Sequence, residues 1–182
     1  MQVTIVLGSR NPDGQTARAA HALLKGVTDA GGTGQEIYLP KMQIESCRQC
    51  EDSGWGICRS EGRCVIDDDL AAIVKKIEAS DAVVFATPVY FSDLSESMRT
   101  FLDRLRRTTR HPTGKAKIEG KLALGICVAG GGGGGAPACT VTLDKVLRTC
   151  GFDLVDLVPV RRQNLDMKLD VLRLTGKWLT QL

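Results

Sequence analysis

Short apolar runs alternate along this chain with segments whose apolar residues recur at helical spacing. Five runs favour strands and five segments favour helices. The predicted strands are residues 3–7, 36–39, 82–86, 121–129 and 152–160. The predicted helices are residues 15–28, 70–77, 94–105, 136–150 and 167–182. This alternation is typical of a parallel sheet, because each parallel connection requires a crossover segment about as long as a helix.

Length and composition favour one folded domain. The chain has 182 residues, of which 43% are hydrophobic and 25% charged, and its composition shows no linker-like break. These values suit a globular domain with a single core and exclude collagen-like and disordered classes. We therefore expect residues 1–182 to form one α/β domain, with helices on both faces of a five-stranded parallel sheet. Residues 45–66 show no clear period and are expected to form a cysteine-rich insertion.

Two local signals set element boundaries. The apolar run 82–86 leads into Thr87 and Pro88, and proline has no amide hydrogen to give a neighbouring strand. We therefore expect the strand to end there and a loop to follow. The acids of residues 67–69 precede a helical pattern and suit the N-cap and the positive end of that helix.

The chain shows no signal for a membrane or a nucleic acid partner. Its start, MQVTIVLGSR, lacks the basic region and cleavage site of a secretory signal, and no apolar stretch is long enough to cross a bilayer. We expect a cytoplasmic protein with reduced thiols. The net charge of +3 and the scarcity of aromatic residues, 4% of the chain, do not suit nucleic acid binding.

Basic residues concentrate between residues 99 and 121, where eight Lys or Arg accompany two acids. Two interpretations remain open for this stretch. It is either a solvated helix end and loop or a docking surface for an anionic cofactor such as NADPH.

The first predicted strand is followed by the loop GSRNPDGQT, residues 8–16. In an open parallel sheet ligands bind beyond the carboxyl ends of the strands, so this loop is a candidate site. It matches neither GxGxxG nor the P-loop pattern. It does combine polar side chains, a turn glycine and the amides of a helix N-terminus, which together suit a phosphate monoester. The alternative is a capped strand-to-helix turn. The candidate phosphate-binding residues are Ser9, Arg10, Asn11, Gly14, Gln15 and Thr16.

Two further loops follow the third and fourth predicted strands. In TPVYFSDLS, residues 87–95, Tyr90 and Phe91 favour an aromatic wall for a planar ligand, or else pack under the sheet edge. Six consecutive glycines, residues 130–135, either let backbone approach a flat ring closely or form a flexible loop. Cys139, just beyond them, is a candidate to face the same ligand.

Four of the seven cysteines lie within eighteen residues, in the pattern C-x2-C-x7-C-x5-C. Thiolates grouped this closely in a reducing compartment commonly bind zinc or an iron–sulfur cluster. The alternatives are reduced structural thiols and a redox disulfide. The candidate metal ligands are Cys47, Cys50, Cys58 and Cys64. The chain shows no Ser/His/Asp set and no carboxylate pair, so we expect no catalytic side chain.

The segments GSRNPDGQT and TPVYFSDLSESMRTFLDR and the glycine loop, in this order, resemble the NADPH-dependent FMN reductase and iron–sulfur flavoprotein branch of the flavodoxin-like superfamily. The resemblance implies a three-layer sandwich with strand order 2-1-3-4-5, bound FMN and a homodimer. It implies that Ser9, Gln15 and Thr16 hold the FMN phosphate. The residues that would line the isoalloxazine ring or its far edge are Thr87, Pro88, Val89, Tyr90, Phe91, Gly130 and Gly131.

This resemblance gives a first functional hypothesis and two alternatives. The first is an FMN-dependent oxidoreductase that passes electrons from NAD(P)H to a quinone, a flavin or another small acceptor, with FMN carrying the chemistry. The second is an iron–sulfur flavoprotein that carries electrons between protein partners; Cys47 and Cys50 match the family's [4Fe–4S] pattern, but the third cysteine has moved to Cys58. The third is a non-catalytic sensor or binding module stapled by zinc.

Overall fold

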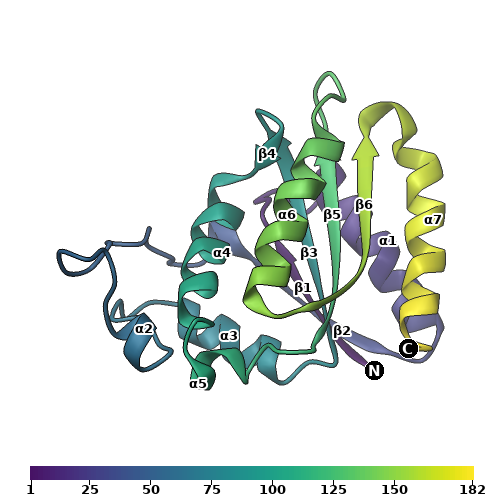
Figure 1. The fold of residues 1–182 in the computed structure, drawn as a ribbon. Helices are drawn as coiled ribbons and strands as arrows, with labels where there is room; N and C mark the ends of the chain where they lie inside the picture. Colours follow the sequence, from purple (N-terminus) through teal and green to yellow (C-terminus); the bar gives the residue numbers. More distant parts are fainter.

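The computed structural model describes residues 1 to 182. Five parallel strands form one central sheet in the order β2-β1-β3-β5-β6 (Figure 1). Counted along the chain, these five strands have the predicted order 2-1-3-4-5, which confirms the fold class. They are β1 (Gln2–Leu7), β2 (Thr33–Tyr38), β3 (Ala82–Tyr90), β5 (Leu122–Ala129) and β6 (Asp153–Arg161).

Helices cover both faces of the sheet and enclose two apolar cores (Figure 1). Residues alternate between the faces, so that Ile5 packs under α1 and α7 while Val6 packs under α3, α4 and α6. Strands buried on both sides explain why the predicted runs are almost wholly apolar. The five helices are α1 (Gln15–Asp29), α3 (Leu70–Glu78), α4 (Glu96–Thr108), α6 (Ala136–Cys150) and α7 (Leu165–Leu179).

The strand β3 does not end before Pro88, contrary to the sequence-based expectation. It continues to Tyr90 and then turns back into β4 (Asp93–Leu94), a two-residue antiparallel strand that was not predicted. The reason is that β1 pairs with β3 only as far as Ala86, whereas β5 pairs with it to Pro88. Proline therefore lies where β3 has no partner on the β1 side, and its missing amide hydrogen breaks no ladder.

The cysteine-rich segment, defined here as residues 42–69, lies outside the sheet and beside α4 (Figure 1). Its anchor is Arg104 on α4, whose guanidinium donates to both carboxylate oxygens of Asp68 at 2.5 and 3.0 Å. Asp68 also accepts the amide of Glu45 at 2.9 Å. The N-cap of α3 is Asp69, but its side chain accepts the Gln43 amide rather than a helix amide. Among the acids of residues 67–69 it is Asp68 that accepts the first amide of the helix, that of Leu70, at 3.2 Å.

Four short helices complete the chain. They are η1 (Leu39–Lys41), α2 (Ile57–Ser60), α5 (Pro112–Lys115) and η2 (Arg162–Asn164). None of the helices combines the length and the apolar composition that a membrane crossing requires.

Candidate flavin cleft and cysteine cavity

The loops after β1, β3 and β5 meet at one edge of the sheet, where the carboxyl ends of these strands lie (Figure 1). They enclose an open cleft of about 450 Å³. Its walls combine three loops that are far apart in the sequence, and every lining residue except Val128 was predicted. The lining residues are Gln15, Thr16, Pro88, Val89, Tyr90, Val128, Gly130 and Gly131.

The loop after β1 presents the N-terminus of α1 to this cleft. Asn11 folds the loop, because its side-chain oxygen accepts the Asp13 amide at 2.9 Å and its carbonyl accepts the Gly14 amide at 3.3 Å. No side chain caps α1, and the amides of Gln15 and Thr16 donate to no protein acceptor. These amides and the helix dipole favour an anion. Asn11 is thus a turn former, while Ser9 and Arg10 lie half-buried and exposed on the same loop.

Gln15 carries an unusual buried acceptor. Its side-chain Oε1 is buried and has no hydrogen-bond partner in the protein. A Cβ placed on Gly130 would lie 3.4 Å from this atom, so the glycine loop and the start of α1 approach each other closely here. A buried acceptor without a donor is unfavourable by about 1–3 kcal/mol. The atom therefore suits a ligand that carries hydroxyl or N–H donors, as the ribityl chain and ring of FMN do.

The turn between β3 and β4 separates the predicted ring-lining residues into two groups. Pro88, Val89 and Tyr90 line the cleft. Thr87 is fully buried and instead accepts the Ser95 amide at 3.1 Å, which fixes the start of α4. Phe91 is not among the residues that line the cleft, and its side chain is fully exposed, so it does not pack under the sheet edge. Its contact with a bound ring stays a prediction.

The glycine loop is tied to the end of β6. Arg161 Nε donates to the carbonyl of Gly133 at 2.8 Å, and Gln163 Nε2 donates to the carbonyl of Gly132 at 3.0 Å. Gly133 has a φ of 79°, which a side chain rarely adopts. A Cβ on Gly131, by contrast, would meet no atom within 4 Å. Sequence analysis missed Arg161 and Gln163, although their place at the carboxyl end of the next strand is the signal that would have found them.

The cysteine beyond the glycine loop does not face the cleft. Cys139 is fully buried beside Cys127, and their hydrogen bond together with burial raises the pKa of the Cys127 thiol well above its usual range. Burial also raises the pKa of Cys150 to about 12. The thiols of Cys127 and Cys150 therefore stay protonated at neutral pH, and all three buried cysteines act as small apolar residues.

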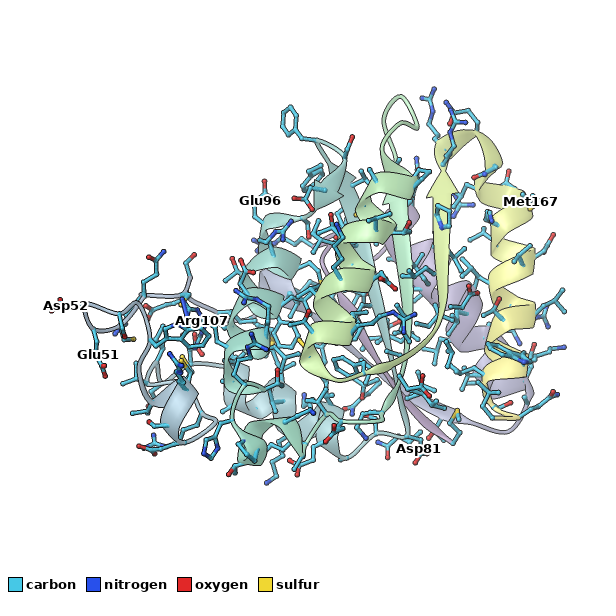
Figure 2. The ribbon with its side chains drawn as sticks, in the orientation of Figure 1. Glu51, Asp52, Asp81, Glu96, Arg107 and Met167 are labelled. Carbon is cyan, nitrogen blue, oxygen red and sulfur yellow. The ribbon has the colours of Figure 1, made fainter.

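The four cysteines of the cysteine-rich segment line one cavity together with arginines, the cysteine cavity. Arg104 Nη2 donates to the sulfur of Cys64 at 3.2 Å. Arg107 lies between α4 and this segment in Figure 2 and stacks over Trp55 at 4.4 Å. The cavity volume is about 20 Å³, which holds about one water. No group of three or more Cys, His, Asp or Glu side chains is positioned to hold a single metal ion. The four predicted ligands are Cys47, Cys50, Cys58 and Cys64.

The basic stretch between residues 99 and 121 is not one continuous docking surface. Arg104 is buried against Asp68, and Arg107 stacks on Trp55. Lys115 pairs with Glu119 at 2.6 Å. Arg104 and Arg107 thus bind the cysteine-rich segment to α4, a role that neither of the two interpretations included, while the exposed pair of Lys115 and Glu119 suits the solvated helix end and loop.

Relatives and solved structures agree with this architecture. An iron–sulfur flavoprotein from Archaeoglobus fulgidus is 31% identical over 124 residues, which are 68% of this chain and 54% of that protein. The chain spans between about half and two thirds of the length of the curated relatives that it matches first.

Two solved structures share the fold. An NAD(P)H:quinone oxidoreductase from Methanothermobacter marburgensis has a TM-score of 0.72 at 20% identity, covering 98% of this chain and 96% of that one. A flavodoxin from the domain Archaea has a TM-score of 0.60 at 13% identity and full coverage of both chains. At these identities the likeness concerns the fold, and it confirms the flavodoxin-like class.

The family described as NADPH-dependent FMN reductase matches residues 1–158, which contain all three cleft loops. Its description names FMN and NADPH, the cofactors that the resemblance implied. Because the match covers most of the 182 residues, the chain belongs to the NADPH-dependent FMN reductase family.

Proposed function

We propose that this protein is an FMN-dependent oxidoreductase that takes electrons from NAD(P)H and passes them to a small acceptor such as a quinone or a flavin. The observation that carries the proposal is the cleft formed by three sequence-distant loops. It combines the unpaired amides at the start of α1 with the side chain of Tyr90 and the side-chain-free backbone of the glycine loop. That combination suits a ligand with a phosphate and a flat ring.

In this proposal the protein binds and orients, and bound FMN supplies the hydride and electron chemistry. The amides at the start of α1 hold the phosphate, with Ser9 and Arg10 on the same loop. The buried Oε1 of Gln15 accepts a hydrogen bond from the cofactor. Val89 and Tyr90 bound one side of the ring and Gly131 the other. This division requires no acid, base or nucleophile from the protein.

The glycine loop offers a matched pair of variants to test the site. A side chain on Gly131 or on Gly132 would meet no atom within 4 Å, and both lie in the same loop, but only Gly131 lines the cleft. We expect Gly131→Val to weaken FMN binding by about 100-fold or more, since it fills the space of the ring, and Gly132→Val to change it by less than about threefold.

The measurement is titration of each purified variant with FMN, followed by anaerobic addition of NADPH. The wild type and Gly132→Val should show a flavin spectrum that NADPH bleaches. A wild type that takes up no flavin would refute the proposal, as would equal FMN affinity in the two variants.

A second candidate is an electron carrier that also holds an iron–sulfur cluster. The favouring observation is that all four cysteines of one segment line a single cavity, and four cysteines are the usual ligands of an iron–sulfur cluster. In the present arrangement the cavity is too small for a cluster, so loading would require the cysteine-rich segment to open. Zinc in a sensor module is the less favoured alternative, because the thiols do not form a tetrahedral set.

Metal analysis separates these candidates. Protein purified without oxygen should contain iron and acid-labile sulfide if the second candidate is correct, and a Cys50→Ser variant should lose both while it keeps FMN. Stoichiometric zinc without flavin would favour the sensor module. Neither metal in anaerobic protein would leave the thiols as reduced structural residues.

Three broader features complete the proposal. We infer that residues 1–182 form a single domain with an insertion at residues 45–66, that the protein works in the cytoplasm, and that it forms a homo-oligomer. One sheet with two continuous cores supports the single domain, and seven unpaired cysteines suit the reducing cytoplasm. The homo-oligomer is what the family resemblance implies.

A further inference from the structure

The glycine loop, residues 130–135, is held by its neighbours at three points. Its start passes Gln15, where a Cβ on Gly130 would lie 3.4 Å from the side-chain oxygen. Its end packs on the β3–β4 turn, because a Cβ on Gly135 would lie 2.5 Å from the hydroxyl oxygen of Ser92. Its middle is hydrogen-bonded to the carboxyl end of β6, beside which the loop rises in Figure 1. Six residues without side chains thus follow one defined path.

The middle contact fixes the direction of two peptide groups. The carbonyl of Gly132 accepts from Gln163 at 3.0 Å, and the carbonyl of Gly133 accepts from Arg161 at 2.8 Å. In a trans peptide group the carbonyl oxygen and the amide hydrogen point in opposite directions, and the chain has no cis peptide bond. The amide hydrogens of the same two peptide groups are those of Gly133 and Gly134, so both point away from the end of β6.

The side away from β6 is the side of the cleft. In the sheet, β5 lies between β3 and β6. The cleft is lined by the loops after β1, β3 and β5 and by no residue of β6, so it lies on the opposite side of β5 from β6. The two amides therefore face the region in which a cofactor ring would lie.

These two amides have no partner within the chain. Neither the amide of Gly133 nor that of Gly134 donates to a protein acceptor, and Gly133 is buried. A buried donor without an acceptor is unfavourable. The loop therefore suits a ligand that presents hydrogen-bond acceptors, and the flavin ring carries two carbonyl oxygens on one edge.

We propose that Arg161 and Gln163 are positioning residues of the flavin site. By holding two carbonyls of the loop, they turn the amides of Gly133 and Gly134 toward the cleft, where these amides donate to the carbonyl oxygens of the flavin ring. The inference rests on the proposed function, since it requires FMN in the cleft. Amides fixed beside these oxygens favour the negative charge that the ring gains on reduction, so the two residues raise the electron affinity of bound FMN.

Three single variants test this role. Gln163→Met and Arg161→Met each remove one donor to the loop, and Gln163→Met does so without changing the net charge. Arg162→Met is the matched control, because Arg162 lies between the two, is exposed, and its side chain makes no hydrogen bond or ion pair. We expect each of the first two variants to bind reduced FMN about tenfold more weakly relative to oxidised FMN, and Arg162→Met to change this ratio by less than about threefold.

The midpoint potential of bound FMN measures the ratio, and tenfold corresponds to a potential lower by about 30 mV for a two-electron couple. Spectroelectrochemical titration of the FMN-loaded protein gives this potential, and thermal denaturation without FMN checks that each variant is folded. Potentials of Gln163→Met and Arg161→Met equal to that of Arg162→Met would overturn this inference alone. A wild type that takes up no FMN would refute the proposed function, and this inference with it.

The second test changes the acceptor on the ligand. In 2-thio-FMN and 4-thio-FMN one ring carbonyl oxygen is replaced by sulfur, a weaker acceptor. We expect one of the two analogues to bind the wild type about tenfold more weakly than FMN does. This difference should shrink below about threefold in Gln163→Met, because the two changes remove the same interaction. Equal binding of FMN and both analogues by the wild type, or an undiminished difference in Gln163→Met, would show that the oriented amides do not donate to the ring.

Discussion

The FMN cleft and the cysteine cavity are both lined by residues from separate parts of the chain, but their walls are held in different ways. The cleft lies at the carboxyl edge of a parallel sheet whose strands are buried on both faces, so its loops start from rigid positions. The cysteine cavity lies in a segment with one four-residue helix, and its main anchor is the buried pair of Arg104 and Asp68. Backbone pairing thus fixes one site, and a set of contacts centred on one buried ion pair fixes the other.

Breaking that pair should produce the largest effect. Arg104 and Asp68 are 1% and 5% exposed, so Arg104→Met leaves a carboxylate buried without its cation. We expect a loss of about 3–5 kcal/mol in the stability of the cysteine-rich segment. FMN affinity should stay within about threefold of the wild type, because the sheet edge does not depend on this pair.

Denaturation is followed by two probes: Trp55 fluorescence for the cysteine-rich segment and backbone circular dichroism for the whole fold. A Trp178→Phe background leaves Trp55 as the single tryptophan. Arg110→Met is the control, since Arg110 is exposed and makes no ion pair, and it should change stability by less than about 0.5 kcal/mol. Equal loss of FMN binding and of the Trp55 signal would show that the two regions are one cooperative unit.

Acid should weaken the cysteine-rich segment before it weakens the sheet. Burial acts to raise the pKa of Asp68, but hydrogen bonds from Arg104 and from the amides of Glu45 and Leu70 outweigh it, and the net pKa is lowered. A carboxyl group whose pKa is lower in the folded state than in the unfolded state stabilises the fold at pH values above its unfolded pKa, about 3.9. That contribution is lost as the pH falls through the folded pKa.

The Trp55 transition of the wild type should therefore move to lower temperature between pH 5 and 3 by more than the circular dichroism transition does. Asp68→Asn removes the titrating carboxyl group. In this variant the midpoint temperature of the Trp55 transition should be low at both pH 5 and pH 3, and it should depend little on pH. A wild-type Trp55 signal that is flat over this range would contradict the assigned role of Asp68.

The difference between the two regions also explains what could be predicted from sequence. The sheet covered on both faces and the three loops that form the cleft follow from apolar periodicity and from the rule that ligands lie beyond the carboxyl ends of strands. The strand order 2-1-3-4-5 and the place of Pro88 and Val89 in the cleft were implied instead by the family resemblance. The function of Arg104 could not be found this way, because its partner Asp68 lies 36 positions away on a segment without periodicity. The end of β3 was mispredicted for a related reason: Pro88 is tolerated within the strand only because β1 ends earlier than β3.

Within the cleft, substitution of Gln15 tests whether its unpaired Oε1 accepts a hydrogen bond from the ligand. Gln15→Met keeps the length of the side chain and removes Oε1, so the FMN-free protein should gain stability while FMN affinity falls by about tenfold, equivalent to one lost hydrogen bond. Thermal denaturation without FMN and titration with FMN measure the two effects on the same samples. If stability rises and affinity is unchanged, the atom is simply an unsatisfied group of the fold and takes no part in the site.

The smallest expected effect concerns the tip of the β3–β4 turn. Phe91 and Ser92 occupy the two central positions between the paired residues Tyr90 and Asp93, with φ of 48° and 63°. Asparagine suits such a position and a bulky aromatic residue does not, and the exposed ring of Phe91 makes no packing that a substitution would lose. Phe91→Asn should therefore raise stability by about 1 kcal/mol. Phe91→Ala, which removes the ring but keeps the Cβ, should gain less, and neither should alter FMN affinity. A large loss of FMN affinity in both variants would show that Phe91 contacts bound FMN.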